Sequence, residues 1–200
     1  MLHLPQDKKI IFFGATYLED RRKGMPLLLE ALAEVRARMD SATISPDQIF
    51  LLVAGLNGHE LLPRIPFAGK YLGQLNDDLT LALAYQSADV FVCPSVEDAG
   101  PMMIPEAMLC GTPVVAFHAG GAPDLITTGK TGYLARLADS ADLASGILSL
   151  LETDNGLGIR GATHLIASKN HLPNQVSKLY SELFSSLATN DRKLPKIGMG

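Results

Sequence analysis

The sequence predicts an α/β fold: a doubly wound parallel sheet of about six strands with helices on both faces. Two observations lead to this fold class. Short apolar runs rich in Val, Ile and Phe recur along the chain, and amphipathic stretches separate them. A strand that is buried on both faces forms a continuous apolar run. Alternation of such strands with helices favours a parallel sheet with right-handed crossovers.

The predicted strands are four long apolar runs and two shorter ones, each closed by Gly, Pro or polar residues. The long runs are KIIFFG (9–14), IFLLVAG (49–55), DVFVCPS (89–95) and TPVVAF (112–117), and the shorter runs are KYLGQL (70–75) and TGYLA (131–135). We expect all of them to pair in a single sheet.

Helices are predicted between the strands and after the last one. In residues 25–39, Leu28, Leu32 and Val35 share one face, which is the pattern of a helix with one side in the core. A further helix is expected from Met102 or Met103 to the glycine at 111. The remaining predicted helices are 79–88, 140–152, 156–168, 173–187 and a short one that begins near Ala122.

Composition favours one domain over residues 1–187, followed by a flexible tail at 188–200. The chain is 47% hydrophobic with a net charge of −4, which argues against a nucleic-acid surface. Cys93 and Cys110 lack metal-ligand spacing and are interpreted as buried thiols. No apolar run reaches the roughly 20 residues that span a bilayer. We therefore expect a cytoplasmic domain without a metal.

Ligands of doubly wound sheets bind beyond the carboxyl ends of the strands. The first loop at this edge contains Arg21, Arg22 and Lys23 just before a helix. Cations at a helix N-terminus oppose its dipole, and a bound phosphate would reverse the sign of that interaction. The alternative is a solvated charge run, partly neutralised by Glu19 and Asp20.

The second loop is EDAGPMMIPEAML, residues 97–109. Free backbone amides at 102–104 could hold a phosphate, and Glu106 offers two acceptor oxygens that match the vicinal hydroxyls of a ribose. The alternative is that Glu97, Asp98 and Glu106 only complement the helix dipole. In the third loop, Gly120 and Gly121 either allow close approach of a ligand or make a tight turn.

Taken together, residues 8–187 resemble the C-terminal, nucleotide-sugar-binding half of retaining glycosyltransferases of family 4, which have the two-domain GT-B fold with Rossmann-like halves. The markers occur in order. They are FFGATYLEDRRKGMPLLLEAL, LLVAG, YLGQLNDDLTLALAYQSADVFVCPS and, most specific, DAGPMMIPEAMLCGTPVVAFHAGGAPDLITTGKTGYL. The last stretch matches a motif of two acids separated by seven residues, followed by a helix, a strand and a double glycine.

The resemblance implies roles for particular residues. Glu106 corresponds to the acid that binds the ribose hydroxyls, and Asp98 to the acid near the donor sugar. Lys23 corresponds to the lysine that neutralises the departing diphosphate, with Arg22 beside it. The remaining expected substrate-binding positions are Gly14, Gly55 and Leu75 in the loops after strands, and Gly100, Pro101, Met102 and Met103 in the turn before Glu106.

The sequence departs from the family pattern at three positions. Asp98 is one methylene shorter than the usual Glu, Pro101 removes one amide donor, and Ala15 stands where many relatives have Arg. The family's N-terminal acceptor domain has no counterpart in these residues, so we expect an excised domain or a truncated gene product. These departures are similar to those of the subset that acts in polysaccharide assembly.

The resemblance implies a donor-binding domain whose full enzyme transfers a hexosyl unit, with retention, from a UDP- or GDP-sugar to a saccharide or lipid-linked acceptor. It implies no cofactor, no metal and no nucleic-acid partner, and it allows peripheral membrane association of the full enzyme at the inner face. We expect this chain alone to bind nucleotide and transfer little. The alternatives are a non-catalytic nucleotide-sugar binding module and a UDP-sugar epimerase on the same architecture.

Overall fold

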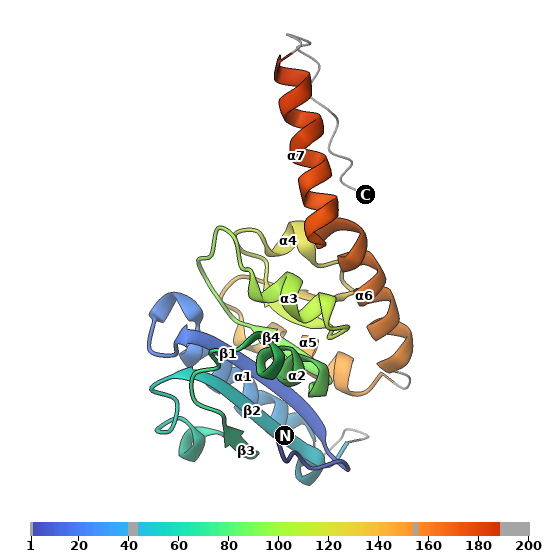
Figure 1. The fold of residues 1–200 in the computed structure, drawn as a ribbon. Coiled ribbons are helices and arrows are strands. Elements are labelled where there is room, and N and C mark those ends of the chain that lie inside the picture. Colours follow the sequence, from blue (N-terminus) through green and yellow to red (C-terminus); the bar gives the residue numbers. More distant parts are fainter. Residues whose placement is uncertain (1, 40–43, 154–155, 189–200) are drawn as a thin grey trace.

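The computed structural model describes residues 2–39, 44–153 and 156–188. Within these residues, six strands form one sheet in the order β3-β2-β1-β4-β5-β6, and every neighbouring pair is parallel. Figure 1 labels β1 to β4 of this sheet. The doubly wound parallel sheet predicted from the sequence is confirmed. The strands are β1 (Lys9–Tyr17), β2 (Ile49–Leu56), β3 (Ala68–Tyr71), β4 (Val90–Cys93), β5 (Val114–Phe117) and β6 (Gly132–Ala135).

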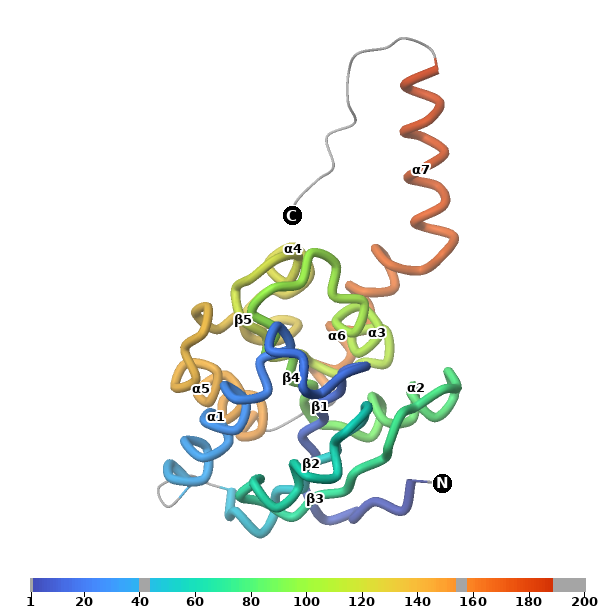
Figure 2. Tube along the Cα trace, turned by 90° about the vertical axis from the view of Figure 1, so that its left-hand side faces the viewer, coloured from blue at the N-terminus to red at the C-terminus, as the bar shows by residue number. Residues whose placement is uncertain are grey.

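Helices cover both faces of the sheet (Figure 2). One layer contains α1 (Met25–Arg38) and α5 (Ser140–Leu151), which pack against each other. The other contains α2 (Asp78–Ser87), α3 (Met103–Leu109) and α6 (Gly156–His171). The helix α7 (Pro173–Ala188) projects away from the sheet in both views. The short helical turns are α4 (Ala122–Leu125), η1 (Arg21–Lys23), η3 (Pro46–Gln48) and η4 (Leu62–Arg64).

Successive residues of each central strand enter opposite cores. Ile11 and Phe13 of β1 face the α1–α5 layer, whereas Ile10 and Phe12 face the α2–α3 layer, and all are buried. The same alternation holds in β2, β4 and β5. Both faces of a strand are therefore apolar, which explains the continuous runs in the sequence. Each such side chain contributes about 1.5–3 kcal/mol of burial free energy.

Several predicted boundaries were wrong. The first strand continues past the predicted end at 14, because residues up to Tyr17 still pair with β2 after a register irregularity. The strand predicted at 70–75 is β3 at 68–71, and the chain then turns at Gly73, whose φ is +72°. Helix α6 extends three residues beyond the predicted end at 168. In the predicted tail, Ala188 ends α7 and 189–200 lie outside the described residues.

The strand order places the candidate site. From β1 the chain proceeds through α1 to β2 on one side, whereas from β4 it proceeds through α3 to β5 on the other. Because β1 and β4 are neighbours, the loops that leave their carboxyl ends diverge. A crevice opens at such a reversal, and ligands of doubly wound sheets bind there.

Candidate functional site

The loop after β1 lies on one side of this switch point. Asp20 caps the turn η1 by accepting from the amide of Arg22 at 3.0 Å. It also accepts from Nε and Nη2 of the same arginine, at 3.2 and 2.8 Å. These bonds hold the pKa of the Asp20 carboxyl below its usual value. The Arg22 side chain is 63% exposed and is ion-paired within its own loop, as the charge-neutralisation alternative expected.

Lys23 joins this loop to the loop after β4. Its Nζ lies 2.7 Å from Oδ2 of Asp98, and the side chains are only 27% and 20% exposed. The backbone joins the same two loops, because the amide of Val96 donates to the carbonyl of Arg22 at 2.9 Å. Two predicted site residues, 75 positions apart in the sequence, are thus in direct contact.

Two glycines allow the backbone to press against the loop that carries Asp98. Gly24 has a φ of +69°, and a Cβ there would lie 1.8 Å from the carbonyl oxygen of Pro94. Gly120 has a φ of +52°, and a Cβ there would lie 1.8 Å from the carbonyl oxygen of Asp98. Gly121 donates its amide to that same carbonyl at 3.3 Å. The double glycine therefore makes a tight turn against the acidic loop.

The turn between Asp98 and Glu106 has fewer unpaired amides than expected. The amide of Ile104 donates to the carbonyl of Pro101 at 3.0 Å, so the expectation of a free donor there was wrong. The amides of Met102 and Met103 donate no hydrogen bond within the described part of the chain. Gly100 donates to Oδ1 of the preceding Asp98 at 3.3 Å. Pro101 is buried in this turn, and Met102 is 67% exposed.

Glu106 lies in the first turn of α3 and is partly buried. Its Oε2 accepts a hydrogen bond from the hydroxyl of Tyr85 at 3.1 Å. Burial raises the pKa of the Glu106 carboxyl above its usual value, the bond from Tyr85 opposes this rise, and the Asp78 carboxylate adds to it. The carboxylate is therefore easier to protonate than an exposed glutamate.

The other predicted positions lie along the same edge of the sheet. Gly14 pairs with Ala54 of β2. Gly55 has a φ of +137°, a Cβ there would lie 1.9 Å from the carbonyl oxygen of Ala15, and its own carbonyl accepts from the hydroxyl of Tyr71 at 2.5 Å. Leu75 is partly buried and packs against the α2–α3 core.

Sequence reasoning missed the hydroxyl of Tyr85. Tyr85 stands in an apolar helix, where it indicates only a core aromatic residue, and its contact with Glu106 spans 21 positions. No local pattern reports such a contact. Among the described residues, no group of three or more His, Cys, Asp or Glu side chains could hold a metal ion. Metal independence stays a prediction.

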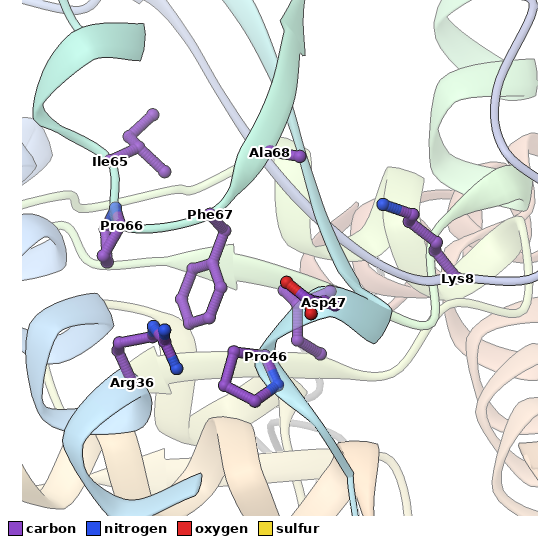
Figure 3. Close-up of a pocket in the computed structure, with 9 residues that line it drawn as sticks. Lys8, Arg36, Pro46, Asp47, Ile65, Pro66, Phe67 and Ala68 are labelled. Carbon is purple, nitrogen blue, oxygen red and sulfur yellow. The ribbon is translucent and has the colours of Figure 1, made fainter.

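A cavity of about 350 Å³ lies away from this crevice (Figure 3). It opens at the amino ends of the strands, next to the starts of β2 and β3, and the Phe67 ring lies among Arg36, Pro46 and Asp47. Because ligands of this fold bind at the carboxyl edge, this hollow is not part of the candidate site.

Comparison with known proteins gives a consistent result. The family described as glycosyl transferases group 1 matches residues 7–153. A phosphatidyl-myo-inositol mannosyltransferase of Mycobacterium leprae is 35% identical over 154 residues, which are 74% of this chain and 38% of that protein. A D-inositol 3-phosphate glycosyltransferase of Corynebacterium jeikeium is 30% identical over 91% of this chain and 45% of its own length.

Solved structures also match most of this chain. The crystal structure of Anabaena HepE with UDP and glucose matches with a TM-score of 0.69 and 27% identity, over 90% of this chain and 49% of that one. The chain thus spans less than half the length of these relatives. Of the helices in the described ranges, none has the length and apolar character needed to cross a membrane.

Proposed function

Because this chain belongs to the glycosyl transferases group 1 family, we propose that it is the donor-binding half of a retaining, family 4 glycosyltransferase with the GT-B fold. The observation that carries the proposal is the ion pair of Lys23 with Asp98 across the β1–β4 crevice. It joins the basic and acidic loops where a doubly wound sheet binds its ligand. Glu106 follows Asp98 by eight positions and lies in the first turn of α3.

In this proposal, Lys23 exchanges Asp98 for the diphosphate of the donor. A lysine that stabilises negative charge as the leaving group departs is electrostatic catalysis. Asp98, released from the ion pair, faces the hydroxyls of the donor sugar. Arg22 adds positive charge at the mouth of the crevice, and the unpaired amides of Met102 and Met103 donate to the phosphate or the sugar.

The nucleoside is proposed to bind along the same edge. The Glu106 carboxylate accepts from the ribose hydroxyls, and Gly14 and Gly55 let the backbone approach the nucleotide closely. Leu75 and its neighbours contact the base. We propose a UDP- or GDP-sugar as the donor, and the binding of UDP and glucose by HepE favours uridine. Two relatives are named a phosphatidyl-myo-inositol mannosyltransferase and a D-inositol 3-phosphate glycosyltransferase. These names favour a lipid-linked or saccharide-like polar acceptor.

The test is a thermal-shift and calorimetry panel of UDP, GDP and ADP and their sugars, with EDTA and with Mg²⁺. A ligand at 100 times its Kd stabilises a domain by about 2.7 kcal/mol. We expect selective stabilisation by UDP or GDP that EDTA leaves unchanged and that Glu106→Gln weakens. A matched control is Glu30→Gln, which removes a carboxylate that accepts from Ser140 in the α1–α5 layer.

Binding without acceptor glycosylation is expected of this chain alone, because acceptor binding is proposed to need a further domain. Robust transfer by these 200 residues would contradict that point. Interconversion of UDP-sugars without an acceptor would indicate an epimerase instead. Failure of every nucleotide to bind would leave no support for a donor site.

A further inference from the structure

Tyr85 is held rigidly under the candidate site. It lies near the end of α2, and its side chain is buried, with the residue 2% exposed. The ring packs edge-on against Phe12 and Phe91, with ring centroids 5.2 Å away in both cases. Its carbonyl accepts from the hydroxyl of Thr112 at 2.6 Å. Ring and backbone are thus both fixed, and the ring can move little relative to β1 and β4.

The one polar atom of this ring is directed at Glu106. The hydroxyl donates to Oε2 at 3.1 Å. Within the described ranges, Oε1 of the same carboxylate has no hydrogen-bond partner. A carboxylate with one oxygen bound to the protein and the other unoccupied is oriented to accept from a ligand. A glutamate without such a partner would sample several rotamers and lose entropy on binding.

We propose that Tyr85 is a positioning residue: its hydroxyl holds the Glu106 carboxylate so that the opposite oxygen accepts from the vicinal hydroxyls of a ribose. The inference rests on the proposed function, because it concerns the nucleotide site of that function. Tyr85, on the buried face of α2, thus helps the site to bind ribonucleotides more tightly than nucleotides that lack the two hydroxyls.

The charges around Glu106 agree with this assignment. Burial, and then the neighbouring carboxylate, raise the pKa of Tyr85 far above its usual value, so the hydroxyl remains a donor at every working pH. The groups that face Glu106 are Tyr85 and Asp78 from α2 and the Cys110 thiol from the end of α3. Of these, Tyr85 alone stabilises the ionised carboxylate.

The experiment compares Tyr85→Phe with Tyr133→Phe. Tyr133 is a matched control, because its hydroxyl also donates to a carboxylate, that of Asp142 at 2.8 Å, on the α1–α5 side. Calorimetry measures the Kd of UDP and of 2′,3′-dideoxy-UDP, and of the GDP pair if guanosine is preferred. Tyr85→Phe is expected to weaken UDP about threefold to tenfold, less than the loss of a direct charge-assisted bond to the ligand, because the hydroxyl acts on the ribose only through Glu106. Binding of the dideoxy nucleotide should not change.

The pH profile supplies a second readout. Without the hydroxyl, the pKa of Glu106 rises further, so the acid limb of UDP binding moves to higher pH in Tyr85→Phe and not in Tyr133→Phe. In a Glu106→Gln background, Tyr85→Phe should cost no further UDP affinity. A measurement on the unmodified chain needs no variant: with tyrosine Cζ labelled with carbon-13, UDP shifts the Tyr85 signal and dideoxy-UDP leaves it in place.

Equal losses for UDP and its dideoxy counterpart, or an unchanged acid limb, would overturn the inference and leave the proposed function intact. If the unmodified chain binds no nucleotide at all, the proposed function fails and the inference fails with it. If Tyr85→Phe does not fold, the carbon-13 titration decides: a Tyr85 signal that responds equally to both ligands assigns the tyrosine to the core alone.

Discussion

At the scale of single residues, Lys23 is expected to decide how tightly the diphosphate binds. Lys23 is a partly buried cation at the candidate site, and its hydrogen bond to a phosphate would be charge-assisted. Lys23→Ala should therefore weaken UDP binding by about 10- to 100-fold, which corresponds to about 1.5–3 kcal/mol. Calorimetric titration measures the Kd directly.

The control for Lys23 is Lys9→Ala. Lys9 also forms a partly exposed ion pair, with Nζ 3.4 Å from Oδ1 of Asp89, but it lies at the start of β1 and thus at the opposite edge of the sheet. Both variants remove one positive charge, so a general electrostatic effect would weaken binding in both. Equal Kd values for the two variants would show that Lys23 does not contact the bound nucleotide.

The ionised Glu106 carboxylate is expected to lower the free energy of unfolding and to strengthen nucleotide binding. Its pKa is raised in the folded chain, so its contribution to stability is fully present below the unfolded pKa and is lost as pH rises through the folded pKa. Glu106→Gln avoids this loss because the amide is neutral. We expect the variant to have an equal or higher free energy of unfolding at neutral pH, with weaker UDP binding.

Urea unfolding of wild type and Glu106→Gln, at neutral and at mildly acidic pH, measures this effect. The advantage of the variant should shrink as pH falls and wild-type Glu106 becomes protonated. In the same pH range the wild type should lose UDP affinity, because a protonated carboxyl accepts less well. A variant that is less stable than wild type at neutral pH would show that the ionised carboxylate stabilises the fold.

At the scale of elements, the tight turn at Gly120 is expected to hold the acidic loop in place. Gly129 provides the control, because its φ of +81° is also positive but a Cβ there would meet nothing within 4 Å. Gly129→Ala should cost about 1–2 kcal/mol for the left-handed backbone alone. Gly120→Ala should cost at least about 2 kcal/mol more, because its Cβ collides with the backbone of Asp98.

Nucleotide binding separates the two glycine variants further. Displacement of Asp98 should break its ion pair with Lys23, so Gly120→Ala is expected to weaken UDP binding while Gly129→Ala leaves the Kd unchanged. Thermal unfolding with and without UDP reports both quantities in one experiment. If the two variants behave alike, the contact of Gly120 with Asp98 does not position the loop.

The elements also show what could be predicted from sequence. The strands were found because a strand buried on both faces has an unmistakable composition, as Ile10–Phe13 illustrates. The ends of the strands were not predicted correctly, because pairing beyond Gly14 depends on β2 rather than on local sequence. The sequence predicted the loops of the site separately, without the contacts between them. The contacts of the site, Lys23 with Asp98 and Tyr85 with Glu106, depend on strand order and helix packing, which no short stretch encodes.

At the scale of the whole molecule, α7 is expected to contribute little to the stability of this chain. It is 16 residues long and has no buried residue. Its apolar residues Leu179, Tyr180, Phe184 and Leu187 are 56–62% exposed. Hydrophobic stabilisation is proportional to the apolar area removed from water, so a helix that buries so little adds little to the free energy of unfolding.

A chain truncated after Leu172 should therefore unfold within about 1 kcal/mol of a chain truncated after Ala188, so that the two differ by α7 alone. The comparison is Leu143→Ala, which removes part of one fully buried side chain from α5 and should cost about 2–5 kcal/mol. Urea unfolding monitored by circular dichroism gives both values. One buried leucine would then outweigh the whole of α7, because stability follows burial rather than length. A truncation that costs as much as Leu143→Ala would show that α7 packs on the domain in solution.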